Sequence, residues 1–440
     1  MTTRRSLGER LPLPEGTLSV GIGLLIGGLC SFAFFRVGKV ALGSEEAFKP
    51  VTGLWFATFA LAPGFFLPLE QELGRALAAR RAQGLGGRPV VRRVLELGAA
   101  LTLLVVVGLI AAAPWLRTEY FRGSWAMVIS LVLAIVAYAP THLARGICAG
   151  TGRFGSYGIV LGADGVMRVL ICLVLAAFSV KAVGAYGLGV ALAPLVGVMV
   201  VGWRRQLSTE PGPDTSWAEV TPNLGWLLLG SVMAAMLVNA APLALSLLAD
   251  KSQDAIVTRF GYGVILARVP LFLFQAIQAA LLPRLSRLAA RGEMLEFRRG
   301  FLRLLTIVTC VGLAGTGAAY VVGPFLVRRL YDATLTNRTL TVLALGSVFY
   351  MVALAAAQAV IALRGHSLVA LGWTVGVAVF VVVTIFGGHE AFRRVELGTL
   401  TGSAAAMVSF LIALRLRLRA GATPDADSLF EAVTDLPVEG

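Results

Sequence analysis

The sequence predicts an all-α polytopic membrane protein with about 12 transmembrane helices in two six-helix lobes. Two observations lead to this fold class. Hydrophobic residues make up 57% of the 440 residues, charged residues only 14%, and the mean hydropathy is +0.82. The apolar residues also gather into stretches long enough to cross a hydrocarbon core of ~30 Å at ~1.5 Å per residue. Because lipid offers no hydrogen bonds to the backbone, such stretches are expected to be helices.

The expected membrane spans account for nearly the whole chain. They cover residues 17–41, 51–69, 94–113, 127–144, 157–179, 184–202, 226–248, 257–282, 304–326, 341–361, 368–386 and 397–414.

The loops between these spans carry their basic residues unevenly. With the N-terminus placed in the cytoplasm, the tails and even-numbered loops hold 23 Lys and Arg, whereas the opposite side holds 10. Basic loops remain in the cytoplasm during insertion, so we expect a multi-pass protein of the cell membrane with both termini cytoplasmic. The net charge of +14 is then a topology signal and a preference for anionic lipid headgroups, and no nucleic-acid partner is expected.

The sequence offers no catalytic or metal site. Its four cysteines are far apart and lie within or beside the expected spans, and its three histidines are scattered near span ends. No metal-ligand spacing and no nucleophile–base grouping occurs in the extramembrane segments. We therefore expect no catalytic residues, no metal, no cofactor and no enzymatic activity.

The two halves of the chain repeat one another. Arg75 and Arg287 occupy similar basic segments 212 residues apart, and Gly152 and Gly365 close similar spans 213 residues apart. A duplicated unit of six helices inserts twice with the same orientation. The expected organisation is an N-terminal tail, an N-lobe, a cytoplasmic linker that lets the lobes rock, a C-lobe and an acidic, disordered tail, at residues 1–16, 17–202, 203–225, 226–414 and 415–440.

Several segments carry a resemblance to a known superfamily. They are Ala267-Arg268-Val269-Pro270 with Gln275, Gln278 and Leu282-Pro283, then Leu69-Glu70-Gln71-Glu72-Leu73-Gly74-Arg75, and Arg145-Gly146 with Gly150-Thr151-Gly152-Arg153. With the span count and the duplication, the chain resembles the multidrug/oligosaccharidyl-lipid/polysaccharide (MOP) exporters, and among them the bacterial polysaccharide-biosynthesis flippases. The resemblance implies a V-shaped, MATE-like pair of lobes around a central cavity, which moves a lipid-linked glycan between leaflets.

Basic residues inside the spans are the candidate substrate-binding groups, because a charge at the bilayer centre needs a partner or a wet cavity. Arg268 is placed ~16 Å along its span, just before Pro270, where a kink is expected. Arg36, Lys39 and Arg259 lie nearer the outer ends of their spans, where snorkelling to the headgroups is the alternative. Gln275 and Gln278 follow Arg268 on the same span and complete the expected substrate-binding set.

Acidic residues are fewer, and each has a simple expected role. Asp164 and Arg168 stand four residues apart and should form a structural pair within the membrane. Glu70 and Glu72 are expected at the solvated cytoplasmic end of their span.

The excess of arginine suits an anion, since a guanidinium binds phosphate with two parallel hydrogen bonds and stays charged. We therefore expect an alternating-access flippase for a polyprenyl-diphosphate-linked oligosaccharide, whose partners are the lipid-linked anionic glycan, membrane lipids, and a glycan polymerase or glycosyltransferases. Three alternatives stay open. They are a peptidoglycan lipid-precursor flippase, a cation-coupled multidrug antiporter, and a non-transporting component of a glycan-assembly complex.

Overall fold

The structure is a computed structural model that describes residues 16–221, 224–271, 274, 288, 291–363 and 365–419. These residues form helices joined by short loops, and no strand occurs among them. Eleven of the described helices are long and apolar enough to cross a membrane, which confirms the all-α, multi-pass fold. The twelfth expected span, 257–282, starts as a helix and then runs into residues that are not described.

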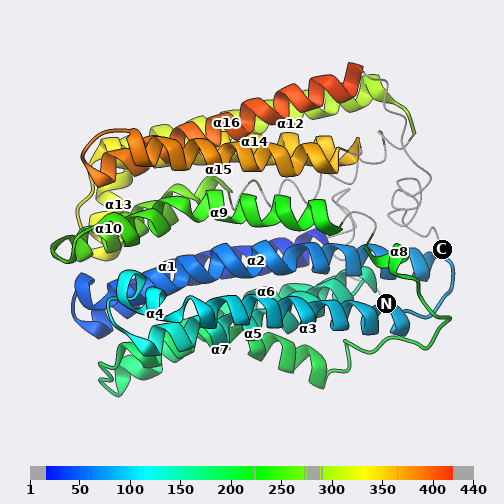
Figure 1. Cartoon of the computed structure of the whole chain (residues 1–440), viewed down its shortest axis with the longest axis horizontal. Helices are drawn as coiled ribbons and strands as arrows, with labels where there is room; N and C mark the ends of the chain where they lie inside the picture. The colour runs from blue at the N-terminus through cyan, green and yellow to red at the C-terminus, as the bar shows by residue number, and fades with distance from the viewer. Residues whose placement is uncertain are drawn as a thin grey trace, which may run out of the picture.

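The first half of the chain provides one group of helices (Figure 1). They are α1 (Thr17–Leu42), α2 (Glu45–Ala82), α3 (Arg88–Ala111), the short α4 (Ala113–Trp115) with the π-helical turn Leu116–Tyr120, α5 (Trp125–Gly150), α6 (Phe154–Ala177) and α7 (Val183–Trp203).

A connecting segment with the short helix α8 (Trp217–Val220) leads to the second group. It consists of α9 (Leu224–Leu248), α10 (Asp254–Ala267), α12 (Met294–Val321), the short α13 (Gly323–Tyr331), α14 (Asn337–Ala362), α15 (His366–Phe386) and α16 (Ala391–Arg419).

The two groups pack by one scheme. In the first, α1 packs on α6, α2 and α3 on α5, and α7 on both α5 and α6. In the second, α9 packs on α15, α10 and α12 on α14, and α16 on both α14 and α15. This repetition is what a duplicated six-helix unit would give, and we call the groups the N-lobe and the C-lobe. The lobes meet mainly where α2 packs against α9 and α10.

Large apolar side chains cover the outside of both lobes, as a bilayer requires. Leu103 and Leu104 on α3 are 64% and 67% exposed, and Phe386 at the end of α15 is 79% exposed. By contrast, α2, α5 and α14 are largely buried between their neighbours. Hydrophobic surface that would be a liability in water is stable against lipid, so these faces mark the membrane-facing perimeter.

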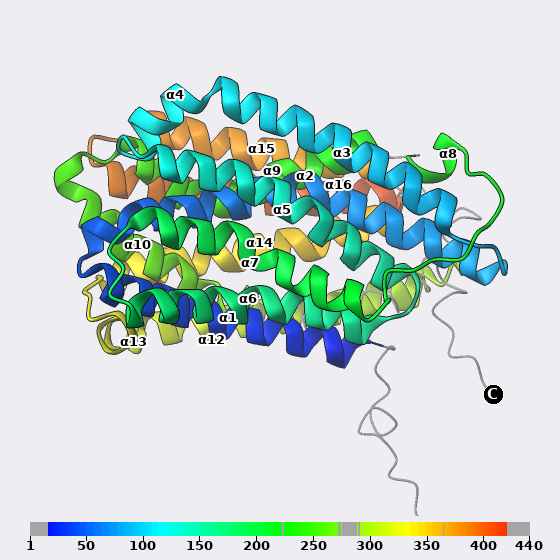
Figure 2. The ribbon, with the colours of Figure 1, turned by 90° about the horizontal axis from the view of Figure 1, so that it is seen from below.

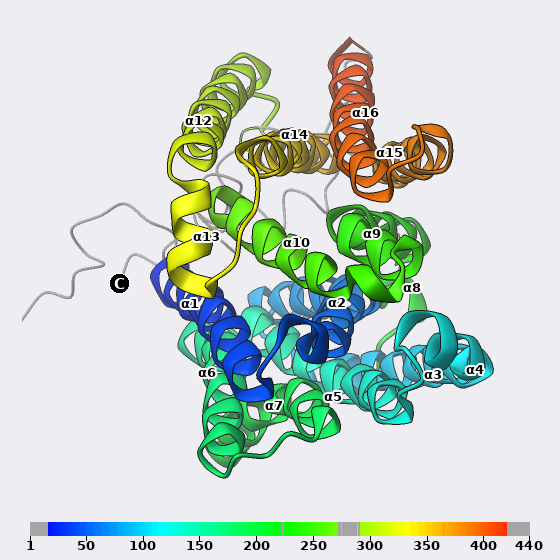
Figure 3. The ribbon, with the colours of Figure 1, turned by 90° about the vertical axis from the view of Figure 1, so that its left-hand side faces the viewer.

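All the long helices run between two ends of the bundle (Figure 2). We call the end at which α1 ends and α2 begins the Glu45 end, and the other the Arg80 end. Figure 3 looks onto the Glu45 end, where α13 crosses from α12 of the C-lobe towards α1 of the N-lobe.

Candidate functional site

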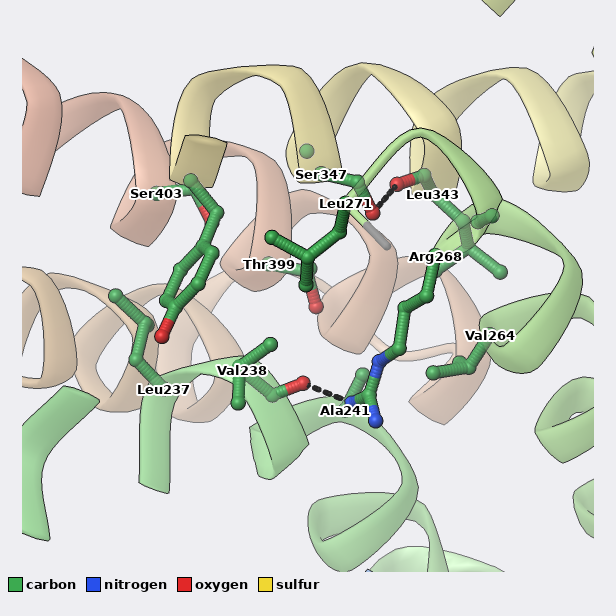
Figure 4. A pocket seen from close by; sticks show the side chains of 13 residues that line it. Leu237, Val238, Ala241, Val264, Arg268, Leu271, Leu343, Ser347, Thr399 and Ser403 are labelled. Carbon is green, nitrogen blue, oxygen red and sulfur yellow. Dashed lines mark hydrogen bonds between the residues drawn. The ribbon is translucent and has the colours of Figure 1, made fainter. Parts of the chain in front are cut away.

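Arg268 lies where the first part of α10 stops. The helix ends at Ala267, Arg268 is its C-cap, and helical backbone resumes at Val269. The cause is Pro270, whose ring clashes with a preceding carbonyl and which lacks an N–H, so the interruption expected from the sequence is present. The Arg268 side chain points towards Val238 and Ala241 of α9, and with residues of α9, α14 and α16 it lines a small cavity in the C-lobe (Figure 4).

The guanidinium of Arg268 is held by neutral groups. It donates to the carbonyl oxygen of Val238 and, at 3.1 Å, to Oδ1 of Asn239, both on α9. Its carbon also lies 5.5 Å from the ring centre of Phe56, on α2 of the N-lobe. No carboxylate of the described residues forms an ion pair with Arg268, and residues 255–292 contain no Asp or Glu at all.

Prolines explain why backbone carbonyls of α2 and α9 are free to accept hydrogen bonds from these side chains. Pro242 on α9 has no N–H, which leaves the carbonyl of Val238, four residues earlier, free to accept from Arg268. Pro63 on α2 frees the carbonyl of Phe59 in the same way, and Asn239 donates to it at 3.1 Å. Asn239 therefore joins the lobes through its amide nitrogen, while its amide oxygen accepts from Arg268.

The expected joint arginine site is not assembled in this conformation. The cavity beside Arg268 measures about 30 Å³, room for a single water and not for a diphosphate. Arg36 lines a different cavity, beside α13. Arg259 is bound to Glu45 instead. Gln275 and Gln278 lie outside the described residues.

The lobes are tied together at the Glu45 end. Arg259 of α10 forms an ion pair with Glu45 of α2, and Thr258 Oγ1 donates to the Glu45 carbonyl at 2.9 Å. Lys39 of α1 lies 3.5 Å from Glu45 Oε1 and donates to the carbonyl oxygens of Tyr331 and Asp332 at the end of α13. Lys39 and Arg259 thus have partners from the opposite lobe, which explains their place near the span ends.

A second set of contacts at the same end centres on Asp254 of α10. Its Oδ1 accepts from Arg122 at 2.9 Å and lies 3.9 Å from Nζ of the buried Lys49, both from the N-lobe. Arg122 also donates to the Ala249 carbonyl at 2.6 Å. Among the described residues, every ion pair between the lobes lies at the Glu45 end. The lobes are therefore closed there.

Inside the N-lobe, Arg168 on α6 pairs with Asp164 one turn earlier. Tyr138 of α5 donates to Asp164 at 3.1 Å and accepts from Arg168 at 2.6 Å. The guanidinium carbon of Arg168 also lies 4.7 Å from the ring centre of Trp55 on α2. This charge is matched within the lobe, and its surroundings are aromatic.

Glu70 overturns the expectation of a solvated helix end. Helix α2 continues to Ala82, and the Glu70 side chain is only 4% exposed. Its carboxylate accepts from Arg145 Nε at 3.0 Å and from Tyr157 at 2.6 Å, and it lies 2.8 Å from His142 Nδ1. Glu72 is buried as well. A carboxylate with partners on α5 and α6 is a functional candidate that the loop pattern did not reveal.

The connecting segment before α9 is bound to the N-lobe. Arg80 at the end of α2 donates to both carboxylate oxygens of Glu219, at 2.6 and 3.0 Å, and to the carbonyls of Pro213 and Asp214. Arg75 donates to the Glu219 carbonyl at 2.7 Å. The segment expected to act as a linker is therefore anchored to one lobe over residues 213–219.

Comparison with solved structures identifies the fold. The chain superposes on a MATE transporter of Vibrio cholerae with a TM-score of 0.66 and 15% identity, over 94% of this chain and 98% of that one. An outward-facing multidrug resistance MATE transporter of the MOP superfamily gives 0.65 and 15%, over 96% and 99%. A MATE structure in the bent conformation gives 0.64 and 15%, over 93% and 97%. The fold is that of the MATE transporters.

Sequence comparison adds a relative without an assigned role. An uncharacterized protein of Mycobacterium tuberculosis is 25% identical over 376 residues, which cover 81% of this chain and 83% of that protein. A protein of Mycobacterium bovis, also uncharacterized, matches to the same extent. No model of a known protein family matches the chain.

Proposed function

We propose that this protein is a membrane transporter of the MOP type that moves a lipid-linked anion, a polyprenyl-diphosphate-linked oligosaccharide, from the inner to the outer leaflet. The observation that carries the proposal is Arg268, a cation inside the membrane at the contact between the lobes whose described partners are all neutral. The transporter fold supports movement of the lobes, and the lack of a counter-charge among the residues that the structure describes supports an anionic substrate.

The energetics of Arg268 favour a ligand that arrives and leaves. An arginine near the bilayer centre costs ~2.5–3.5 kcal/mol even on insertion scales. Two hydrogen bonds to Val238 and Asn239 offset part of this cost, and both acceptors are neutral. A diphosphate would supply the missing charge and match the two-pronged geometry of the guanidinium.

Access to Arg268 requires the lobes to separate. Phe56 of α2 lies over its guanidinium from the N-lobe, and the cavity beside it holds about one water in the present arrangement. If α2 moves away from α9 and α10, the phosphate groups can reach Arg268 from between the lobes. The polyprenyl tail would remain in lipid, since the glycan and diphosphate are the groups that avoid the hydrocarbon. No bond is made or broken, so the proposed protein is not an enzyme.

The orientation follows from the basic residues. We propose that the Arg80 end faces the cytoplasm, with both termini, and that the closed Glu45 end faces outwards. Cysteines placed at the exposed Ser208 and Thr334 report this with an impermeant thiol reagent on intact cells, after replacement of the exposed native Cys310. Position 334 should react and position 208 should not, and the reverse pattern would invert the assignment.

The test of the function is the lipid pool of a strain that lacks the gene. Deletion should cause a lipid-linked oligosaccharide to accumulate, and the wild-type gene should clear it. At equal protein abundance, Arg268→Ala should fail to clear it and Arg268→Lys should restore transport only in part, because an ammonium lacks the two-pronged contact. The exposed Arg393, which forms no ion pair in the described residues, is the matched control. Normal clearance by Arg268→Ala would refute the role of this arginine.

A cation-coupled multidrug antiporter is the second candidate, and Glu70 is the observation that favours it. A buried carboxylate beside His142 can exchange a proton or cation with a wet cavity. Arg145, however, already neutralises Glu70 within the N-lobe. Drug efflux that depends on a proton or sodium gradient and is abolished by Glu70→Gln, with no change in the lipid-linked precursors, would select the antiporter.

A further inference from the structure

A second group of arginines lies at the Glu45 end, away from Arg268. Arg36 of α1 and the pair Arg328 and Arg329 of α13 line one cavity of about 270 Å³, together with Phe325 and Asp332. The cavity is about nine times the volume of the one beside Arg268. Its walls come from both lobes, since α1 belongs to the N-lobe and α13 to the C-lobe (Figure 3).

The charges around this cavity do not cancel. Arg36, Arg328 and Arg329 are exposed, and within the described part of the chain none of their side chains forms a hydrogen bond or an ion pair. Asp332 contributes a single negative charge, which leaves a surplus of two positive charges around one space. Three guanidinium groups around one space with a single carboxylate repel one another, and an anion bound among them would stabilise this arrangement.

The position of α13 indicates which anion can reach the cavity. Val327 and Tyr331 bury one face of the helix, and the ring of Tyr331 stacks on Tyr262 of α10 at 4.3 Å. The opposite face carries Phe325, 63% exposed, beside the two arginines. An apolar side chain next to arginines at the end of a membrane bundle is typical of the level of the lipid headgroups.

The contacts of Lys39 hold the two walls of the cavity together. Lys39 lies one turn after Arg36 on α1, and its ammonium donates to the carbonyls of Tyr331 and Asp332 at the end of α13. These carbonyls carry the partial negative charge of a helix C-terminus, so the contact is favourable. It places Arg36 of one lobe beside the arginine pair of the other.

We infer that Arg36, Arg328 and Arg329 form a binding site for the phosphate of a membrane lipid in the leaflet at the Glu45 end, and that this lipid bridges the two lobes. The site is separate from Arg268 and does not depend on which substrate the protein transports. Its ligand chemistry is a phosphate group, which a lipid headgroup or free phosphate could supply. The exposed Phe325 beside it favours the lipid, because a lipid also provides acyl chains for that side chain.

The experiment is lipid binding to the purified full-length protein in detergent, followed by native mass spectrometry. The probe is dioleoylphosphatidylglycerol, with dioleoylglycerol as the lipid without phosphate and inorganic phosphate as the phosphate without acyl chains. We expect phosphatidylglycerol to bind to the wild type, and Arg36→Gln, Arg328→Gln and Arg329→Gln each to weaken binding at least threefold. Arg393→Gln removes an exposed arginine elsewhere on the C-lobe and should leave binding unchanged.

Three results would overturn the inference. Equal lipid binding by the three variants and the Arg393→Gln control would show that the cavity is not the site. A loss with Arg328→Gln and Arg329→Gln but not with Arg36→Gln would show that the lipid does not bridge the lobes. Displacement of the lipid by inorganic phosphate at millimolar concentration would assign the site to a free anion. Binding of dioleoylglycerol as strong as that of phosphatidylglycerol would assign it to the acyl chains. The three side chains are exposed, so the variants should fold normally.

Discussion

The two lobes pack alike, but the arginines buried inside them have different kinds of partner. In the N-lobe, Arg168 is 3% exposed and paired with Asp164, and Arg145 is paired with the buried Glu70. In the C-lobe, the guanidinium of Arg268 contacts one backbone carbonyl oxygen, one side-chain amide oxygen and an aromatic ring. Arg168 and Arg145 thus have their counter-charges within the N-lobe, whereas Arg268 lacks a counter-charge among the described residues.

This difference separates a structural charge from one that can bind a ligand. A buried ion pair fixes its two side chains, and removal of one partner leaves an uncompensated charge behind. A cation held by neutral oxygens can exchange them for an anion without stranding a carboxylate. The position of Arg268 at the contact between lobes adds a means of controlling access, because Phe56 belongs to the opposite lobe. The comparison predicts opposite consequences for substitutions in the two lobes.

The largest effect on stability is expected at Asp164. Asp164→Ala leaves Arg168 buried without its carboxylate, and the loss of one partner of a buried pair typically costs about 3–5 kcal/mol. We expect a strong fall in the amount of folded protein in membranes, measured by immunoblot and by thermal unfolding in detergent. The double variant Asp164→Ala/Arg168→Met removes both charges and should recover most of the loss. If Asp164→Ala accumulates like the wild type, the N-lobe pair is not structural.

At Arg268 the expected effect on stability is smaller and can take either sign. Arg268→Met removes two hydrogen bonds to neutral acceptors, each worth ~1.5–3 kcal/mol with a charged donor, but also removes the cost of a charge inside the membrane. We expect the unfolding temperature to change by less than that of Asp164→Ala, with transport abolished. A fall in unfolding temperature as large as that caused by Asp164→Ala would show that Arg268 is a structural residue. The contrast between the lobes would then be wrong.

The smallest of these effects is expected at the Glu45 end. Glu45→Gln removes a charge that contacts Arg259 of the opposite lobe, and a partly exposed pair of this kind is worth up to ~1 kcal/mol, or about fivefold in population. Spin labels at the exposed Thr118 and Glu390 should show a larger share of molecules with separated lobes. Glu119→Gln is the control, because Glu119 is exposed and forms no ion pair with any residue that the structure describes. Identical distance distributions for both variants would show that the Glu45 pair does not hold the lobes closed.

The sequence was sufficient for the membrane spans because their signal is local. Apolar stretches of the right length predicted eleven helices that the structure contains, and Pro270 predicted the interruption at Arg268. The Asp164–Arg168 spacing also placed both side chains on one helix face. Each of these inferences needs only helix geometry and the cost of exposing polar groups to lipid.

The missed features depend on contacts between distant segments. The sequence predicts a solvated end at Glu70 because the apolar stretch stops at residue 69, but α2 continues to Ala82 and the Glu70 side chain is bound by α5 and α6. Arg259 showed no partner in its own span, since Glu45 lies 214 residues earlier. The carbonyl that receives Arg268 is free because of Pro242, a relation visible only once α9 and α10 are adjacent.

The proposed role of Arg268 is to bind the phosphate groups of a lipid-linked substrate, and a direct binding measurement tests this role. Purified wild-type protein and its Arg268→Ala variant would be titrated with a polyprenyl diphosphate and with the corresponding uncharged polyprenol. We predict that Arg268→Ala weakens binding of the diphosphate at least tenfold and leaves the polyprenol unaffected, with Arg393→Ala behaving as the wild type. Equal affinity of wild type and Arg268→Ala for the diphosphate would contradict the claim.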